Sequence, residues 1–227
     1  MNAHAHDARI RATWEANAAA WTEAVRARRI ESRRVATDAA IVEACAARGA
    51  GPLLDVGCGE GWLLAELAAR GVTPLHGIDT APALVAAIPA LPGVSGEVCD
   101  YATLVRDPAR CAGPWRTILC NFALLDADVT PVLAALAHRL APEGALVVQT
   151  VHPWAALGDA PYASAWREET WQAFGGAFVE PMPWFYRTLA DWHAAVRAAG
   201  LVVTDLREPV HPETGRPLSL LLVLAAA

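Results

Sequence analysis

The chain has 227 residues, of which 55% are apolar and 19% charged, and its formal net charge at pH 7 is −6. This length suits one α/β domain with a modest insertion and excludes two full-sized enzyme domains, while the apolar content argues against disorder along most of the chain. All 18 basic residues are Arg, so the lack of Lys excludes Schiff-base catalysis by a lysine and a lysine-dependent phosphate-binding loop.

The first predicted elements are helical. Residues 7–48 are rich in Ala, Glu and Arg and contain neither Pro nor Gly, which predicts one long helix or two consecutive helices. Strands and helices then alternate. We predict strands over 52–56, 73–78, 94–99, 116–120 and 145–151, helices over 60–70 and 82–88, and a further helix that Thr130 caps and Pro131 opens. This alternation predicts a parallel sheet with helices on both faces.

The regular pattern breaks after residue 151. About 35 residues follow without clear periodicity, which is long for an ordinary loop and indicates an insertion or lid. Thr188 and Asp191 resemble a capping box, and Gly200 ends the helix that they open. Strands over 201–206 and 218–224 close the chain. We predict one domain over 1–227, with a helical cap (1–49), a cofactor-binding core (50–151), a substrate lid (152–186) and a closing helix with strands (187–227).

The segment after the first strand carries the strongest signal for a ligand site. Gly57, Gly59 and Gly61 stand at alternate positions behind an acid, Asp55. In a parallel α/β sheet such a turn lies at the carboxyl ends of the strands, where ligands bind. The dinucleotide fingerprint spaces its glycines as GxGxxG, whereas this turn reads GxGxG. The segment therefore predicts a cofactor site of another kind.

This acid-xGxGxG segment resembles the first motif of the class I S-adenosylmethionine-dependent methyltransferases. The resemblance covers roughly residues 50–151. It implies S-adenosyl-L-methionine as the methyl donor, S-adenosyl-L-homocysteine as the product, and a doubly wound, mostly parallel seven-stranded sheet with an antiparallel last strand. Asp79 follows the second strand in Gly-Ile-Asp, where the family places an acid on the two ribose hydroxyls, which one carboxylate can bind together.

The resemblance implies further cofactor contacts. Asp100 and Tyr101 follow the third strand, where the family binds adenine; a helix-capping Asp with a surface Tyr is the alternative. Asn121 and Phe122 follow the fourth strand and should line the sulfonium end. They lack the Pro-Pro-aromatic signature of nucleic-acid amino-methyltransferases, which favours a small substrate. The expected cofactor-binding residues are Asp55, Gly57, Cys58, Gly59, Asp79, Thr80, Asp100, Tyr101, Asn121 and Phe122, with Trp21 and Arg33 from the helical cap.

Aromatic residues are concentrated in the predicted lid. Nine of the 16 aromatic residues lie within 152–186. Aromatic faces attract a cation, exclude water and stack on flat molecules, although we expect about half of these rings simply to pack the lid onto the sheet, because exposed aromatic patches are costly. The expected substrate-binding residues are Trp154, Trp166, Trp171, Trp184 and Tyr186.

His152 immediately follows the fifth strand and is the candidate general base. A free imidazole titrates near pH 6.5, close to the working pH of most enzymes. The alternative is a structural His that holds the following loop. The sequence thus predicts transfer of a methyl group to O or N of a small, aromatic or heterocyclic molecule. Methylation of carbon, or a non-catalytic regulatory protein that binds S-adenosylmethionine, are the alternatives.

Charge and cysteine usage restrict the partners. Residues 1–34 are locally basic, as a solvated helix face or as a source of one Arg for a ligand carboxylate, but the rest of the chain is acidic, which disfavours nucleic acid. The five Cys form no CxxC pair and no zinc-type spacing, so we expect reduced thiols, no metal and a cytoplasmic location. The longest apolar run is too short to span a bilayer. We expect a monomer or homodimer that binds a small molecule and no membrane.

Overall fold

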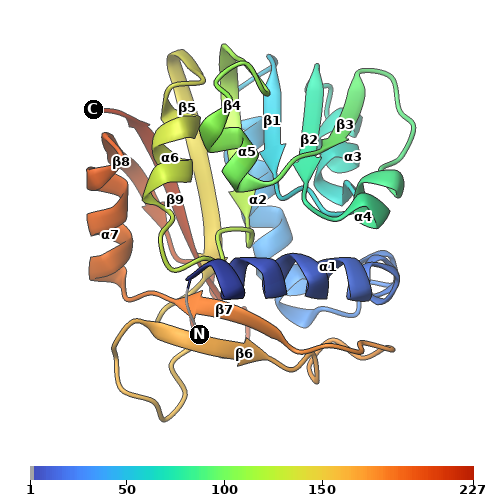
Figure 1. The fold of residues 1–227 in the computed structure, drawn as a ribbon, viewed down its shortest axis with the longest axis vertical. Coiled ribbons are helices and arrows are strands. Elements are labelled where there is room, and N and C mark those ends of the chain that lie inside the picture. The colour runs from blue at the N-terminus through green and yellow to red at the C-terminus, as the bar shows by residue number, and fades with distance from the viewer. Residues whose placement is uncertain (1–2) are drawn as a thin grey trace.

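A seven-stranded sheet organises the computed structural model, which describes residues 3–227 (Figure 1). The strand order is β3-β2-β1-β4-β5-β9-β8. Strands β3, β2, β1, β4 and β5 are mutually parallel, and β9 runs antiparallel to both of its neighbours. The strands are β1 (Leu53–Val56), β2 (Leu75–Asp79), β3 (Val94–Val98), β4 (Trp115–Asn121), β5 (Leu140–Val151), β8 (Leu201–Arg207) and β9 (Ser219–Ala226). The predicted doubly wound, mostly parallel sheet with an antiparallel last strand is confirmed.

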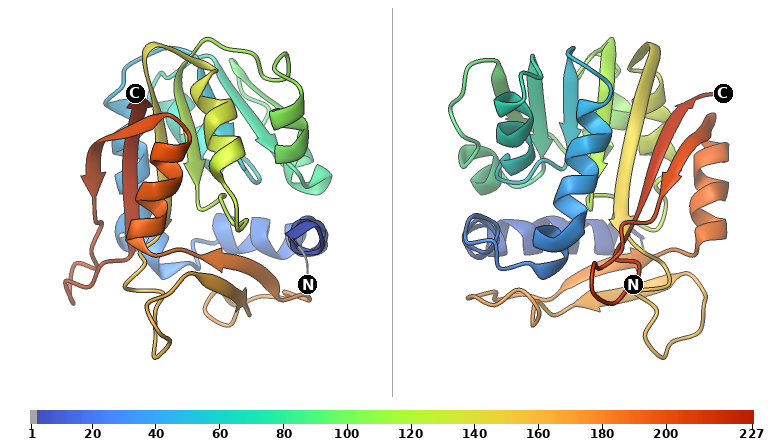
Figure 2. Two further views of the ribbon diagram at one scale, coloured as in Figure 1. Left: turned by 60° about the vertical axis from the view of Figure 1, so that its left-hand side comes forward. Right: turned by 180° about the vertical axis from the view of Figure 1, so that it is seen from behind.

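Helices bury both faces of the sheet (Figure 2). One face packs against α2 (Asp38–Ala46) and α3 (Trp62–Ala69), and the other against α5 (Tyr101–Arg106), α6 (Thr130–Ala137) and α7 (Leu189–Ala198). All four residues of β1 are buried, which explains why the central strands read as continuous apolar runs rather than alternating ones. The site described below lies at the ends of these buried central strands.

The predicted helical cap consists of α1 (Ala3–Arg26) and α2, with a short π-helical turn, η1 (Arg33–Thr37), directly before α2. Figure 1 shows α1 lying across one end of the sheet rather than on either face. It packs against α4 (Pro82–Ala86) and against a strand of the lid. In the part of the chain that the structure describes, no helix combines the length and apolar character needed to cross a membrane.

The lid contains a hairpin that the sequence did not predict. Strands β6 (Ala165–Glu169) and β7 (Met182–Tyr186) pair antiparallel as a separate two-stranded sheet, and α1 lies between this hairpin and the main sheet (Figure 1). The strand signal is weak for two reasons. β6 carries three consecutive charged residues, and Pro183 stands inside β7, where it removes a ladder donor.

Helix starts agree with the sequence in one case and differ in another. Thr188 caps α7 as predicted, because its hydroxyl accepts the N–H of Asp191 at 3.1 Å. Thr130, predicted as a cap, is instead the first residue of α6. The Asp128 carboxylate accepts the Thr130 N–H at 3.0 Å, so the polar side chain at this helix start lies two residues earlier than predicted.

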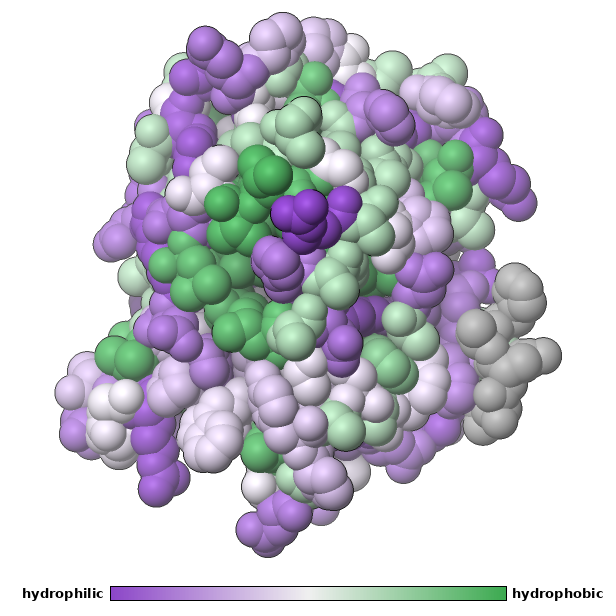
Figure 3. All heavy atoms as spheres, turned by 90° about the vertical axis from the view of Figure 1, so that its left-hand side faces the viewer, coloured by the Kyte–Doolittle hydropathy of each residue, from purple (hydrophilic) through white to green (hydrophobic). Residues whose placement is uncertain are grey.

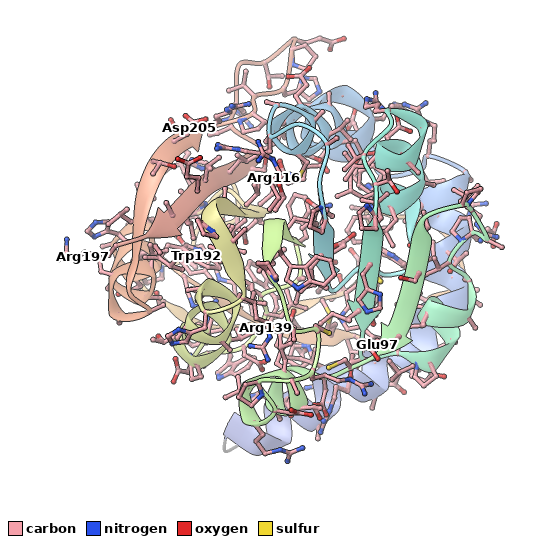
Figure 4. All side chains as sticks on the ribbon, turned by 90° about the horizontal axis from the view of Figure 1, so that it is seen from above. Glu97, Arg116, Arg139, Trp192, Arg197 and Asp205 are labelled. Atoms are coloured by element: carbon pink, nitrogen blue, oxygen red, sulfur yellow. The ribbon has the colours of Figure 1, made fainter. Side chains whose placement is uncertain are left out.

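The two edges of the sheet are β3 and β8. Glu97 on β3 and Asp205 on β8 mark these edges when the sheet is seen from above (Figure 4). Val202 and Leu206 of β8 are exposed, and Figure 3 shows apolar side chains among polar ones on the side of the molecule where β8 and α7 lie. The residues that directly follow β3 reach the cavity described below, which lies at the ends of the central strands.

Candidate active site

The glycine turn forms the floor of the site. Gly57 and Gly59 have φ values of +78° and +57°, which glycine adopts without the steric cost that an L side chain meets. A Cβ on Gly57 would lie 2.4 Å from the Cβ of Ala123, in the loop after β4. The N–H groups of Gly57 and Cys58 both donate to the Ile78 carbonyl, at 2.8 and 3.0 Å. The turn is thereby held against the ends of two neighbouring strands.

Asp79 ends β2 beside this turn. One of its carboxylate oxygens accepts the Gly59 N–H and the other accepts the Ala81 N–H, both at 2.9 Å. The side chain is almost buried, and burial raises its pKa although these N–H groups counter the effect. Each carboxylate oxygen has a second lone pair. Asp79 therefore retains acceptor capacity for two further donors from a ligand.

Two more buried carboxyls surround the turn. Burial, followed by the charges of Asp79 and Glu60, raises the pKa of Asp55 well above its usual range, and burial also raises the pKa of Glu60. Glu60 accepts the indole N–H of Trp21 at 3.1 Å. Asp55 Oδ1 and Glu60 Oε1 have no hydrogen-bond partner within the described residues 3–227. Buried oxygens of this kind favour a ligand that brings N–H donors or positive charge.

The helical cap contributes Trp21 and Arg33 to the site near the glycine turn. The guanidinium of Arg33 lies 4.2 Å from the centroid of the Trp62 ring and 6.0 Å from that of Trp21, and its Nε donates to Asp38 at 2.9 Å. Sequence reasoning selected Trp21 and Arg33 only by position. It missed Glu60 and Trp62, although Glu60 is the variable residue between the second and third glycines and Trp62 directly follows them.

Asp100 and Tyr101 follow β3. Asp100 caps α5 by accepting the Thr103 N–H at 2.7 Å, and its other oxygen pairs with Arg11 of α1 at 2.8 Å. Burial alone would raise the Asp100 pKa, but the bonds from Thr103 and the charge of Arg11 outweigh burial and lower the pKa. The Tyr101 hydroxyl donates to the Ala123 carbonyl at 2.9 Å. The capping alternative thus describes Asp100, whereas Tyr101 is partly buried rather than at the surface.

Asn121 ends β4, and Phe122 directly follows it. Asn121 Oδ1 accepts from Gln149 Nε2 at 2.9 Å, and the same nitrogen donates to the Thr37 carbonyl at 3.0 Å. Phe122 has a φ of +54°, a conformation that costs a non-glycine residue free energy and is concentrated at functional sites. Gln149, on the neighbouring strand β5, was not predicted. It fixes the orientation of the Asn121 amide.

One cavity of about 530 Å³ joins these strand ends to α1 and to the hairpin. All twelve residues predicted to bind the cofactor border it, as do three of the five predicted to bind the substrate, namely Trp171, Trp184 and Tyr186. The other two lie outside its lining. Trp154 is 67% exposed, and the Trp166 ring stacks on His6 with centroids 3.8 Å apart.

The aromatic cluster ties the lid to α1. The Trp171 ring stacks on Phe178 at 4.8 Å and meets Trp14 edge to face at 5.5 Å. Its indole N–H donates to the Glu180 carbonyl at 2.6 Å, and only 4% of the residue is exposed. Trp171 therefore both packs the lid and borders the cavity, while Phe178 only packs.

His152 does not border the cavity. Its Nδ1 accepts the Trp154 N–H at 3.1 Å, so Nε2 carries the proton and donates to Glu208 at 2.8 Å. Both ring nitrogens are thus engaged in holding the loop after β5. This geometry favours the structural alternative for His152 and leaves the cavity to other titratable groups.

A second cluster has the residue types of a metal site. Ligand atoms of His76, Glu97 and Cys111 lie within 4.8 Å of one another. Glu97 already pairs with Arg110 at 2.9 Å and accepts the Cys111 thiol hydrogen at 3.2 Å. Burial and then its hydrogen bond to Glu97 raise the pKa of Cys111 to about 12, so the thiol holds its proton at neutral pH. The cluster is held by its own hydrogen bonds.

The order of the seven strands and the acid-glycine turn beneath the cavity define the protein as a class I S-adenosylmethionine-dependent methyltransferase. A family model described as "Methyltransferase domain" matches residues 27–206. Because this match spans more than half of the chain, the protein belongs to that family. No curated protein sequence is significantly similar to it.

Solved structures share the fold at low sequence identity. The 1,6-didemethyltoxoflavin-N1-methyltransferase of Burkholderia thailandensis, crystallised with 1,6-didemethyltoxoflavin and S-adenosylhomocysteine, matches with a TM-score of 0.70 and 16% identity over 100% of this chain and 91% of that one. An S-adenosylmethionine-dependent methyltransferase from Mesorhizobium loti gives 0.60 and 20% over 81% and 95%. A glycopeptide N-methyltransferase complexed with S-adenosylmethionine gives 0.61 and 16% over 82% and 92%.

Proposed function

We propose that the protein methylates an O or N atom of a small, flat aromatic or heterocyclic molecule that binds between the strand ends and the β6–β7 hairpin. The observation that carries this proposal is the continuous cavity of about 530 Å³ that runs from the glycine turn to the aromatic side chains of the hairpin. Pockets of about 300–1,000 Å³ with apolar walls and a few polar groups are typical of small-molecule sites.

The residues at the floor suit the methyl donor. Asp79 would accept the ribose hydroxyls with its free lone pairs, and the unpartnered buried oxygens of Asp55 and Glu60 would face the positively charged end of the molecule. Arg33, which borders the same corner, would bind its carboxylate. When bound, S-adenosylmethionine supplies a methyl group activated by a sulfonium.

The walls suit a planar acceptor. Trp184 and Tyr186 on β7 border the cavity, and Phe122 borders it from the loop directly after β4. Rings on two sides would hold a flat molecule in one plane and exclude water. Such orientation is worth about 7–11 kcal/mol in a well-aligned displacement. The open volume supports catalysis over a regulatory protein whose lid leaves no room for a substrate.

Calorimetric titration with S-adenosylhomocysteine tests the proposed donor site. Transfer from radiolabelled S-adenosylmethionine to a panel of phenols, aromatic amines and nitrogen heterocycles tests the proposed acceptor site. We expect saturable binding of one product molecule per chain and transfer to at least one nitrogen or oxygen acceptor. Binding without transfer to any acceptor would favour the regulatory alternative, and label on carbon would favour C-methylation.

A further inference from the structure

Asp126 and Arg187 are two of the charged side chains that border the same cavity and belong to none of the predicted sets. Asp126 lies in the loop after β4, and Arg187 directly follows β7. They come from the two elements that enclose the acceptor side of the cavity. Arg187 is buried and lacks a hydrogen bond that such a group ordinarily makes when it is removed from water, whereas Asp126 is half-buried.

Arg187 is buried without full hydrogen bonding. Only 4% of the residue is exposed, its Nη1 donates to the Leu124 carbonyl at 3.4 Å, and its Nη2 has no partner among residues 3–227. The guanidinium packs against the rings of Phe185 and Trp192, at 5.2 and 4.9 Å. Burial lowers its pKa to about 10, so the group still carries a positive charge at neutral pH.

Arg139 shows what a structural buried arginine looks like in this fold. It is 6% exposed and its guanidinium makes four hydrogen bonds, to the carbonyls of Leu104, Asp107, Arg110 and Ala135 (Figure 4). Arg187 is buried to the same degree and makes one long bond. The missing partner of Arg187 is therefore best supplied by an oxygen atom of a ligand.

Asp126 complements this cation. It borders the cavity, is partly buried, and accepts no hydrogen bond from any residue within 3–227. The groups that act on it electrostatically are Asp7, Arg187, Arg11 and His6, from α1 and the end of β7. Burial and then Asp7 raise its pKa to about 6. Such a carboxylate is charged at neutral pH yet accepts a proton readily, as general bases do.

The remaining charges disfavour an anionic acceptor. Besides Asp126, the cavity is bordered by Asp7, Glu168 and Glu169 on the acceptor side, against Arg11, Arg167 and Arg187. Arg11 is paired with Asp100, and Arg167 donates to the Ala156 carbonyl. Among these three arginines, Arg187 has a guanidinium nitrogen, Nη2, without a partner in residues 3–227. Arg187 and Asp126 act on each other electrostatically. A donor group and an acceptor group related in this way match a neutral molecule that offers an oxygen beside an N–H.

We propose that Arg187 and Asp126 recognise a lactam or imide, in which a ring C=O stands beside the N–H that is methylated. Arg187 donates to the carbonyl oxygen, and Asp126 accepts the N–H proton. The nitrogen lone pair forms the new N–C bond, the C–S bond of the donor breaks with its electron pair on sulfur, and the proton stays on Asp126. Negative charge that develops on the carbonyl oxygen meets the guanidinium. This inference rests on the proposed methyltransferase function and specifies its acceptor.

Binding provides the first test. Uracil, lumazine and alloxazine, which are N–H imides of increasing size, are titrated calorimetrically into the protein saturated with S-adenosylhomocysteine, each beside its N,N′-dimethyl derivative. We expect at least one imide to bind, and its dimethyl derivative to bind about tenfold or more weakly. Salicylate, a phenol whose adjacent carboxyl group is ionised at neutral pH, is titrated as the anionic comparison. Equal binding of imide and dimethyl derivative, binding of none of the three imides, or preference for salicylate would overturn the proposal.

Variants provide the second test. Arg187→Gln and Arg187→Lys should weaken binding of the imide about tenfold or more, with S-adenosylhomocysteine affinity unchanged. The control Arg197→Gln, at an exposed residue (Figure 4), should leave both affinities unchanged.

Asp126→Asn should lower transfer to the imide about 100-fold or more and remove the rise of kcat near pH 6. The control Asp159→Asn, at an exposed residue, should change neither the rate nor its pH dependence. An Asp126→Asn variant that keeps the wild-type pH profile contradicts the proposed base. If the wild-type protein does not bind S-adenosylhomocysteine, this result would instead contradict the methyltransferase function itself.

Discussion

The carboxylate of Asp79 accepts the backbone N–H of Gly59 at 2.9 Å and so joins the end of β2 to the turn after β1. Its other oxygen accepts the Ala81 N–H at the same distance. These two bonds orient the acid and shape the glycine turn through the protein's own groups. A site whose residues are held by such bonds spends less of the binding free energy on ordering them.

Asp79→Ala should weaken S-adenosylhomocysteine binding by at least about tenfold, because it removes the proposed acceptor for both ribose hydroxyls and the anchor of the turn. Asp79→Asn should fall between the wild type and Asp79→Ala, since an amide keeps one acceptor oxygen. Calorimetric titration measures both. Thermal unfolding of each variant controls for loss of the fold, and wild-type affinity in a folded Asp79→Ala protein would rule out the ribose assignment.

Local patterns account for how well the sheet could be predicted from the sequence. Strands buried on both faces, such as β1, appear as apolar runs, and the turn residues around Gly57 mark their ends. The β6–β7 hairpin could not be predicted in this way. Its stability comes from contacts with α1, for example between Asn17 and the backbone of Val179 and Glu180, and these contacts join residues more than 150 positions apart in the sequence.

The predicted site shows the same division. The cofactor-binding residues at strand ends could be predicted because the fold brings the carboxyl ends of the parallel strands together, and each of these residues borders the cavity. Asp126 and Arg187 were not found, because neither stands in a motif. The significance of Arg187 depends on its burial and its unmade hydrogen bond, and that of Asp126 on its place at the cavity near charged groups of α1 and the end of β7. These are properties of the packed structure. His152 was selected by its place after β5, but the direction of its side chain depends on Glu208.

Gly57→Ala should destabilise the protein more than Gly71→Ala. The two residues have nearly the same φ, +78° and +80°, but a Cβ meets Ala123 at 2.4 Å in the first case and nothing within 4 Å in the second. Both variants bear the cost of a left-handed alanine, roughly 1–2 kcal/mol. Only Gly57→Ala adds overpacking, about 1–3 kcal/mol. Urea unfolding measures the difference, and equal losses would show that the Ala123 loop moves aside freely.

Asp126→Asn should stabilise the protein at neutral pH. The pKa of about 6 in the folded state lies above the usual Asp value of 3.8, so the folded state holds the proton more tightly and stability falls as pH rises from about 4 to 6. The shift corresponds to about 3 kcal/mol at 1.4 kcal/mol per pKa unit, which partial exposure reduces to roughly 1 kcal/mol. Urea unfolding at pH 7.5 should show this gain, and at pH 4 most of it should disappear. A loss of stability at both pH values would contradict the raised pKa.

His152→Ala should reduce stability with little effect on turnover. The variant loses the acceptor for the Trp154 N–H and the donor to Glu208, at a cost of about 1–3 kcal/mol for hydrogen bonds of a buried group. Urea unfolding and kcat, measured on the same preparation, separate the two effects. A fall in kcat of about 100-fold with unchanged cofactor affinity would return His152 to the role of general base.

Trp21→Phe should cost more stability than Trp14→Phe, although the two indoles meet edge to face at 5.1 Å and lie on the same helix. Trp21 Nε1 is the donor to Glu60 Oε2, and the other oxygen of Glu60 has no partner within residues 3–227. Phe at position 21 therefore leaves a buried carboxylate without its indole donor, which costs about 1–3 kcal/mol and raises the Glu60 pKa further, because the Trp21 bond lowers it. Trp14 makes no ring N–H bond to a described residue, so Trp14→Phe tests the loss of packing alone. Urea unfolding of both variants at pH 7.5 compares their losses in free energy of unfolding. Equal losses would show that Glu60 does not depend on the indole donor.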